Sequence, residues 1–444
     1  MKRCQRPGGA RGEGDPHRGR VVRTDLTGSE QGGTMPRGRS SVNSRRSPGL
    51  RMEFRKLEVQ ERRLAMRIAF HAGTLRGFGS GLVGRNVLES LARLGDQHAF
   101  LAWVPKSWRD DHGVTPQTCP PNVELRFTDP GMLSKLTLEN VKIRSALRSW
   151  GADVLFSAGD TSMIACPIPH LLLIHQPNLS YGTSEKGFES TIKERLRWAA
   201  MSQYLRMGLP SIDKVTVQTQ DMADRISRRF GYDRSRILVV PSAVDGPGER
   251  SPVEPATLPN PYICYIASPS RHKNFEVLPA MMAGLRERCP ELKCRLTIHR
   301  DAIPALAEEI DALGLSEQFV FEGPVTRDRA LTLLGEATAL VMPSWLESFG
   351  LPYYEAMMLG VPVVAADRGF AREALGEAGL YAHPSDGAEF AQAVASLALD
   401  PTERRSRAQA VRARFDETAR TWEQVSGRYL EFLEALHRRG SGAR

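Results

Sequence analysis

Residues 341–367, VMPSWLESFGLPYYEAMMLGVPVVAAD, decide the fold. An apolar run ends at Met342, a loop follows, and Pro352 and Gly360 mark the two ends of a short helix before the next apolar run. Proline is tolerated in the first turn of a helix, and glycine suits the left-handed residue after the last turn. The segment therefore predicts a strand, a loop, a helix and a second strand, with the helix N-terminus at the carboxyl edge of a parallel sheet.

The loop and the start of this helix form a candidate anion site, because unpaired backbone N–H groups and the positive dipole end lie there. Gly350 lets the backbone approach a ligand closely, and Glu347 and Glu355 flank the helix start. Phosphate oxygens accept hydrogen bonds from N–H groups, whereas carboxylates accept from sugar hydroxyls. The pattern favours a nucleotide sugar. Two glutamates at this spacing also occur as a helix cap and a solvated side chain, so spacing alone does not decide between the two.

In the rest of the chain from residue 66 on, apolar runs alternate with helical stretches, which is typical of a parallel α/β sheet. The Pro- and Gly-rich stretch 241–261 has no apolar period and indicates a linker between two such series. We expect two Rossmann-like domains that face each other across a cleft, and an amphipathic C-terminal helix. The expected strands are 68–71, 99–104, 154–157, 171–175, 214–219, 262–267, 294–298, 319–321, 339–342 and 361–366.

Composition bounds the class of protein. The 444 residues are 41% hydrophobic and 25% charged, as in ordinary globular proteins of two or three domains. The formal charge of +9 lies entirely in residues 1–65, where 16 Lys and Arg face 7 Asp and Glu. This Gly-, Pro-, Ser- and Arg-rich segment predicts a disordered basic tail outside the fold, and we expect the native chain to start near Met66. A nucleic-acid partner is therefore not expected.

Targeting and metal signals are missing from the sequence. No apolar run reaches a membrane-spanning length, and the N-terminus lacks a secretory signal, so we expect a cytoplasmic protein. Six cysteines are scattered without C-x-x-C spacing, which favours free thiols over a zinc site or disulfides. No D-x-D motif is present, and no acidic residue directly follows the second expected strand, 99–104, where a dinucleotide-binding domain has one. We therefore expect no metal and no cofactor.

The order P-S-x-x-E-S-F-G-L-P-x-x-E-A-M-x-x-G-x-P-V-V-A, at 343–365, resembles the donor-binding segment of retaining GT-B glycosyltransferases of family 4 (group 1). That family includes bacterial mannosyl- and glucosyltransferases of cell-surface polysaccharides. The resemblance implies that Glu347 contacts the transferred sugar and Glu355 holds the ribose. It also implies that Ser348, Phe349, Gly350 and Leu351 face the sugar and the diphosphate. The C-terminal helix is then expected to cross back to the first domain.

Residues 265–274, YIASPSRHKN, place basic side chains after an apolar strand and before a helix. Cations there would stabilise the charge that develops on a diphosphate leaving group. The segment resembles the family's G-[ST]-x-x-x-x-K-N element, which implies that Lys273 binds the phosphates, with Ser268 and Arg271 beside them. Ala267 stands where the family usually has glycine. A solvated basic helix start is the alternative interpretation.

In the first half, His175 ends an apolar strand at the edge where open parallel sheets bind ligands. Lone histidines are more often structural, but the family has a catalytically important His here, usually followed by Asp; this chain has Gln176. The loop with Gly79, Ser80 and Gly81 is expected to bring backbone amides to phosphate or acceptor.

Basic stretches at 134–148 and 186–206 are either solvated helix faces or a surface for the inner membrane leaflet. The expected domains are 66–245 for the acceptor, 246–260 as the linker, 261–417 for the nucleotide sugar, and the helix 418–438.

The expected function is retaining, metal-independent transfer of a mannose- or glucose-type hexose from a nucleotide diphosphate sugar to a saccharide or lipid-linked saccharide. A non-catalytic nucleotide-sugar-binding protein, or a GT-B enzyme of another type such as an epimerase, is the alternative. A phosphorylase would need a pyridoxal-binding lysine, for which the sequence offers no candidate.

Overall fold

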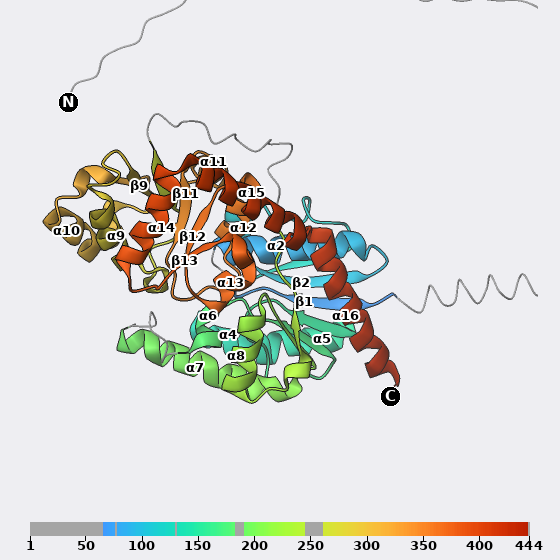
Figure 1. Ribbon diagram of the computed structural model, residues 1–444. Coiled ribbons are helices and arrows are strands. Elements are labelled where there is room, and N and C mark those ends of the chain that lie inside the picture. Colours follow the sequence, from blue (N-terminus) through green and yellow to red (C-terminus); the bar gives the residue numbers. More distant parts are fainter. Residues whose placement is uncertain (1–64, 76–77, 129–130, 183–190, 245–260, 443–444) are drawn as a thin grey trace, which may run out of the picture. The chain divides into compact units, whose positions relative to one another are not determined.

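The computed structural model describes residues 65–75, 78–128, 131–182, 191–244 and 261–442 (Figure 1). The predicted tail, apart from Ala65, and the predicted linker 246–260 lie outside these residues. Both sheets belong to one compact unit, Val59–Arg444. The domain boundaries drawn from the sequence stay a prediction.

Seven parallel strands of the described residues form the first sheet, in the order β3-β2-β1-β4-β5-β6-β7. The strands β1, β4 and β5 are almost wholly buried, as expected for a parallel sheet covered by helices on both faces. The strands are β1 (Arg67–His71), β2 (Ala99–Pro105), β3 (Val123–Thr128), β4 (Val154–Ser157), β5 (His170–Leu173), β6 (Lys214–Val217) and β7 (Ile237–Val239).

Helices connect these strands, and some of them begin at a capping residue whose side chain accepts from a backbone N–H of the first turn. Thr191 and Glu194 form a reciprocal capping box at α7, and the Thr219 side chain accepts from the Met222 N–H at α8. The helices are α2 (Phe78–Leu94), α3 (Ser107–His112), α4 (Met132–Thr137), the π-helical turn η1 (Leu138–Ile143), α5 (Arg144–Trp150), α6 (Pro177–Tyr181), α7 (Ile192–Gly208), η2 (Leu209–Ser211), α8 (Gln220–Phe230) and η3 (Arg234–Arg236).

The second sheet has six parallel strands among the described residues, in the order β10-β9-β8-β11-β12-β13. Its strands are β8 (Tyr262–Tyr265), β9 (Lys293–Leu296), β10 (Phe319–Phe321), β11 (Ala339–Met342), β12 (Val363–Ala366) and β13 (Leu380–Ala382). Its helices are η4 (Arg271–Lys273), η5 (Phe275–Val277), α9 (Leu278–Leu285), η6 (Arg300–Ala302), α10 (Pro304–Ala312), η7 (Ser316–Gln318), α11 (Arg327–Gly335), α12 (Leu351–Leu359), α13 (Gly369–Leu375), η8 (Gly376–Ala378), α14 (Gly387–Leu399) and α15 (Pro401–Thr418).

The last helix, α16 (Trp422–Gly442), does not pack on the sheet that precedes it in the chain. It lies against α2 and the strands β4 and β5 of the first sheet (Figure 1). Val425, Tyr429, Leu433 and Leu436 are buried in the first core, and the Tyr429 ring lies 5.0 Å from that of Phe156. The predicted fold class is confirmed, including the helix that crosses back.

Candidate active site

Two residues predicted to bind the donor lie together at the carboxyl edge of the second sheet. Lys273 follows β8 and Glu347 follows β11, and these two strands are neighbours in the sheet. The Lys273 Nζ donates to Glu347 Oε1 at 2.6 Å, and the two side chains are only 15% and 9% exposed. The sequence predicted that both residues face a ligand. The structure adds that they pair with each other.

The backbone around Lys273 is fixed by buried hydrogen bonds. Asn274 is left-handed, with φ of +57°, and its Nδ2 donates to the carbonyls of Pro343 (2.9 Å) and Pro384 (2.7 Å). The Tyr265 hydroxyl donates to the Lys273 carbonyl at 2.7 Å. These contacts connect the Lys273 turn to the loop that carries Glu347.

The position of Lys273 differs from the expectation in one respect. The sequence suggested cations directly before a helix, but Lys273 ends the turn η4, and Asn274 and the turn η5 separate it from α9. The left-handed Asn274 between the two turns interrupts a continuous helix there. Ser268 and Arg271 are exposed on the same segment, and their contact with a donor stays a prediction.

The start of α12 has the predicted form. Gly350 is the N-cap with φ of +74°, and a Cβ on it would lie 2.5 Å from Tyr353 Cδ2. Phe349 is buried and stacks on Tyr354 with ring centroids 4.2 Å apart. The Ser348 carbonyl accepts from Thr219 Oγ1 of the first-sheet half at 3.4 Å. Leu351 touches the apolar clusters of both sheets.

Glu355 is buried on α12, so the solvated interpretation of this residue does not hold. Its Oε1 lies 3.4 Å from a guanidinium nitrogen of Arg327 at the start of α11. The sequence analysis missed Arg327, because the pair joins two helices whose packing no local pattern predicts. The buried carboxylate can accept hydrogen bonds from ligand hydroxyls, as the resemblance implies.

In the first sheet, three neighbouring strands bring polar side chains to one edge. Asp160 follows β4, His175 follows β5 and Gln218 follows β6. Asp160 Oδ1 accepts from the backbone N–H of His175 (2.6 Å) and of Gln176 (2.8 Å). Gln218 Nε2 lies 3.2 Å from His175 Nδ1. Asp160 and Gln218 were not predicted, although both could be found as polar residues just beyond apolar strands.

One nitrogen of the His175 ring, Nδ1, contacts Gln218, and the direction of this hydrogen bond depends on the tautomer of the ring. The other nitrogen, Nε2, is buried without a hydrogen-bond partner among the described residues. Burial lowers the pKa of His175, while the charge of Asp160 and the Ala158 carbonyl oppose that effect.

A cavity of about 510 Å³ opens at this edge, lined by residues that follow β1, β4 and β5 and by α7. Its polar lining carries cations, a carboxylate, an amide and hydroxyls: Thr74, Ser80, Lys135, Asp160, Gln176, Lys193 and Arg197. This lining is suited to a ligand that has both hydroxyl groups and an anionic group. The cavity is the candidate acceptor site.

The predicted glycine loop is part of a helix. The helix α2 begins at Phe78, so Gly79, Ser80 and Gly81 lie in its first turn. Ser80 lines the cavity. Gly81 faces the other way, because a Cβ on it would lie 2.7 Å from His112 Nε2. The role of these residues toward an acceptor stays a prediction.

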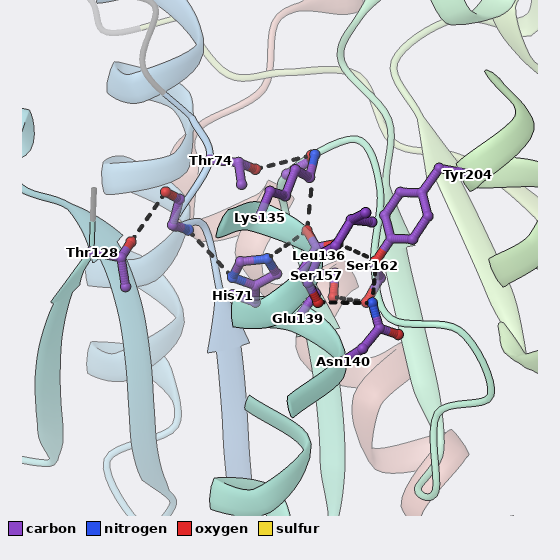
Figure 2. Close-up of polar contacts among 12 residues, drawn as sticks. His71, Thr74, Thr128, Lys135, Leu136, Glu139, Asn140, Ser157, Ser162 and Tyr204 are labelled. Carbon is purple, nitrogen blue, oxygen red and sulfur yellow. Dashed lines mark hydrogen bonds and ion pairs between the residues drawn. The ribbon is translucent and has the colours of Figure 1, made fainter. Parts of the chain in front are cut away.

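A buried carboxylate belongs to a polar network that includes Lys135 of the cavity lining (Figure 2). Glu139, in η1, is fully buried; its Oε1 lies 3.1 Å from His71 Nε2 and 3.9 Å from Lys135 Nζ, and its Oε2 accepts from the Tyr204 hydroxyl at 2.6 Å. Burial alone would raise the pKa of Glu139. The His71 hydrogen bond and the Lys135 charge lower this pKa by more than burial raises it, so the net shift is downward. An ionised Glu139 thus holds Lys135 at the cavity wall. Sequence analysis did not predict this network.

The described residues offer neither a metal site nor a membrane-spanning helix. No group of three or more His, Cys, Asp or Glu side chains there could hold a metal ion. No helix in the described part of the chain is long and apolar enough to cross a membrane. The five described cysteines are all free thiols.

Family models match both halves of the chain. The model described as "Glycosyltransferase Family 4" matches residues 79–246, and the model described as "Glycosyl transferases group 1" matches residues 260–400. The D-inositol 3-phosphate glycosyltransferase of Nocardia farcinica is 30% identical over 251 residues, which is 52% of this chain and 54% of that protein. The chain thus spans about half the length of the curated relatives it matches.

Solved structures share the fold at low sequence identity. Sucrose-phosphate synthase from Thermosynechococcus elongatus superposes with a TM-score of 0.65 at 19% identity, over 84% of this chain and all of that one. WaaG, a glycosyltransferase involved in lipopolysaccharide biosynthesis, gives 0.62 at 14% identity, over 82% and 99% of the two chains. Anabaena HepE in complex with UDP-glucose gives 0.61 at 18%, over 83% and 100%.

The two parallel sheets and their neighbours among solved structures define the GT-B fold of glycosyltransferases. With a family model on each half, the chain belongs to the family 4, group 1 glycosyltransferases.

Proposed function

We propose that the protein is a retaining hexosyltransferase that uses a nucleotide diphosphate sugar. The observation that carries this proposal is the buried Lys273–Glu347 pair beside the N-terminus of α12. The ammonium and the helix start supply positive charge for a diphosphate, and the carboxylate supplies an acceptor for sugar hydroxyls. Donor binding exchanges the partner of Lys273 from Glu347 to phosphate, which frees Glu347 for the sugar.

The acceptor binds in the cavity at the edge of the first sheet in this proposal. We propose a saccharide or lipid-linked saccharide of cell-surface polysaccharide synthesis. The cavity lining, with Lys135, Lys193 and Arg197, also supports a small phosphorylated polyol, the class of substrate that the name of the inositol phosphate relative states. The two classes are distinguished by the acceptors in the experiment below.

The chemistry follows from the groups present. The bond between the sugar's anomeric carbon and the phosphate oxygen breaks, and the acceptor oxygen bonds to the same face of that carbon. The acceptor proton passes to the leaving phosphate, while Lys273 and the α12 N–H groups stabilise the diphosphate. His175 Nε2–H donates to a hydroxyl of the transferred sugar. Trapping of a covalent glycosyl-enzyme would contradict this route.

We also propose that the protein is cytoplasmic and touches the inner membrane leaflet through α7. Ile192 and Leu196 are 78% and 66% exposed there, between Lys193, Arg195 and Arg197. Apolar side chains flanked by cations favour an anionic lipid surface. Sedimentation with vesicles of phosphatidylglycerol, but not with vesicles of phosphatidylcholine, is the expected result.

The experiment compares the wild-type chain, Glu347→Ala and the control Glu403→Ala, whose ion pair with Arg407 lies on α15. Each protein is incubated with UDP-, GDP- and ADP-sugars in EDTA, and nucleoside diphosphate release is measured alone, with sugar and inositol phosphates, and with cell-envelope lipid. We expect one donor to be used, acceptor-stimulated release, and a loss of about 100-fold or more in Glu347→Ala only.

Two outcomes favour other functions. A donor that raises the melting temperature without release under any condition supports a nucleotide-sugar-binding protein. Conversion of the donor sugar without an acceptor supports an epimerase. Activity that requires a divalent ion would contradict the metal-independent mechanism.

A further inference from the structure

Asp160 occupies an unusual backbone position at the cavity. Its φ is +67°, which non-glycine residues adopt rarely and only where surrounding contacts hold them. Its own N–H donates to the Leu173 carbonyl at 3.2 Å, and the Ala158 N–H donates to the His71 carbonyl at 2.8 Å. The turn after β4 is therefore tied to the ends of both neighbouring strands.

The carboxylate of Asp160 acts on the segment that carries His175. One oxygen accepts from two consecutive backbone N–H groups, those of His175 and Gln176. From the other side, Gln218 contacts the ring itself. The backbone and the ring of His175 thus have separate contacts, and its buried Nε2 has no hydrogen-bond partner among the described residues.

A purely structural role would not require a carboxylate here. Asparagine adopts left-handed conformations at least as readily as aspartate and offers the same carbonyl oxygen to the two N–H groups. A carboxylate adds negative charge next to a buried imidazole and at the wall of a cavity that it lines together with Gln176. Among the described residues, Asp160 is the charged group that affects the pKa of His175. The other polar groups close to the His175 ring are the Gln218 amide and the Ala158 carbonyl.

We propose that Asp160 is a positioning residue that orients His175 and Gln176 toward the reacting atoms at the acceptor cavity. This inference rests on the proposed transferase function. Asp160 acts through His175, whose unpartnered Nε2 would meet a substrate oxygen at hydrogen-bond distance. A small displacement of such a group lowers the rate of a transfer reaction steeply.

The test uses the full chain as wild type, Asp160→Asn and Asp160→Gly, because both substitutes tolerate positive φ. The matched control is Asp213→Asn, because Asp213 Oδ2 likewise accepts a backbone N–H, that of His170, but at the opposite end of β5. We expect a drop in kcat of roughly tenfold to hundredfold in Asp160→Asn and a larger drop in Asp160→Gly, with an unchanged donor-induced melting shift. Asp213→Asn is expected to keep the wild-type kcat.

The pH profile separates positioning from stability. The Asp160 charge raises the pKa of His175, so its removal lowers that pKa further. The neutral ring is the active form, so the acid limb of the kcat profile is expected to move to lower pH in Asp160→Asn. The titration of His175, assigned with His175→Gln and followed by NMR of ¹⁵N-labelled histidines, is expected to move in the same direction.

The kcat measurements and the NMR titration together distinguish a wrong positioning role from a wrong proposed function. If the wild type turns over and both Asp160→Asn and Asp160→Gly keep kcat within twofold with the same acid limb, the positioning role is wrong. If the wild type uses no donor, the proposed function is wrong, and the NMR titration alone decides the inference: an unchanged His175 titration in Asp160→Asn overturns it.

Discussion

Buried histidines make the stability of this protein dependent on pH. His170, at the start of β5, is fully buried, and its Nε2 lies 3.0 Å from Ser157 Oγ. Burial lowers its pKa to about 3, below the ordinary value of 6.5. The unfolded chain therefore binds a proton between these pH values that the folded chain does not bind, and stability is lost as the pH falls through 6.5.

We expect His170→Gln to weaken this dependence. Between pH 7 and pH 5 the wild type should lose about 2 kcal/mol of unfolding free energy that the variant does not lose. Urea unfolding at the two pH values measures the difference. His383→Gln, at an exposed position, is the control with the wild-type slope. Equal slopes in His170→Gln and the wild type would contradict the effect.

At the scale of residues, sequence analysis identified side chains that end strands or start helices. His175, Lys273 and Glu347 all lie at carboxyl edges, where the strand pattern placed them. Arg327 was missed because its partner lies on another helix, whereas Asp160 lies just beyond an apolar strand and could have been found by the same pattern. The pairing of Lys273 with Glu347 was missed because it depends on β8 lying beside β11.

At the scale of elements, the start of α12 depends on Gly350. Alanine there would have a strained backbone and a Cβ 2.5 Å from the Tyr353 ring. We expect Gly350→Ala to lower stability by about 1–3 kcal/mol and to abolish the melting shift caused by nucleotide, because the N–H groups of α12 are displaced.

The control for this variant is Gly113→Ala, which has a similar φ of +63° and no atom within 4 Å of the added Cβ. It carries the backbone strain without the clash. Thermal unfolding with and without UDP measures both effects. A nucleotide shift that survives in Gly350→Ala would show that α12 does not bind the phosphates.

The elements found from the sequence are those with continuous apolar runs. All ten predicted strands exist, and 154–157, 319–321 and 339–342 have the predicted bounds. The strands β3, β7 and β13 were missed. They are short or charged edge strands; in β3, Glu124 and Arg126 alternate with apolar residues, so no apolar run marks it.

At the scale of the molecule, α16 is part of the first core. Leu433 is fully buried there. We expect Leu433→Ala to cost about 2–5 kcal/mol and to reduce hydrogen-exchange protection in β1 and β4 more than in β8 and β11. Glu431→Ala, in an exposed ion pair on the same helix, is the control. Equal loss of protection in both sheets would contradict this assignment.

The architecture was predictable because periodicity changes with each element and because the segment 341–367 has the order of a known family. Contacts between the halves were not predictable. The Glu373 carboxylate of α13, for example, accepts from the Gln220 N–H at 2.8 Å at the start of α8. Such contacts depend on how the two folded halves pack against each other, which no local sequence pattern encodes.

The place of α16 has a consequence for how the protein is made. A ribosome produces the strands β1 to β7 first, yet the first core includes Val425, Tyr429, Leu433 and Leu436. Domains often fold in order during synthesis. Here the first core is complete only after the whole second sheet has been translated, so the first strands to be made depend on the last helix.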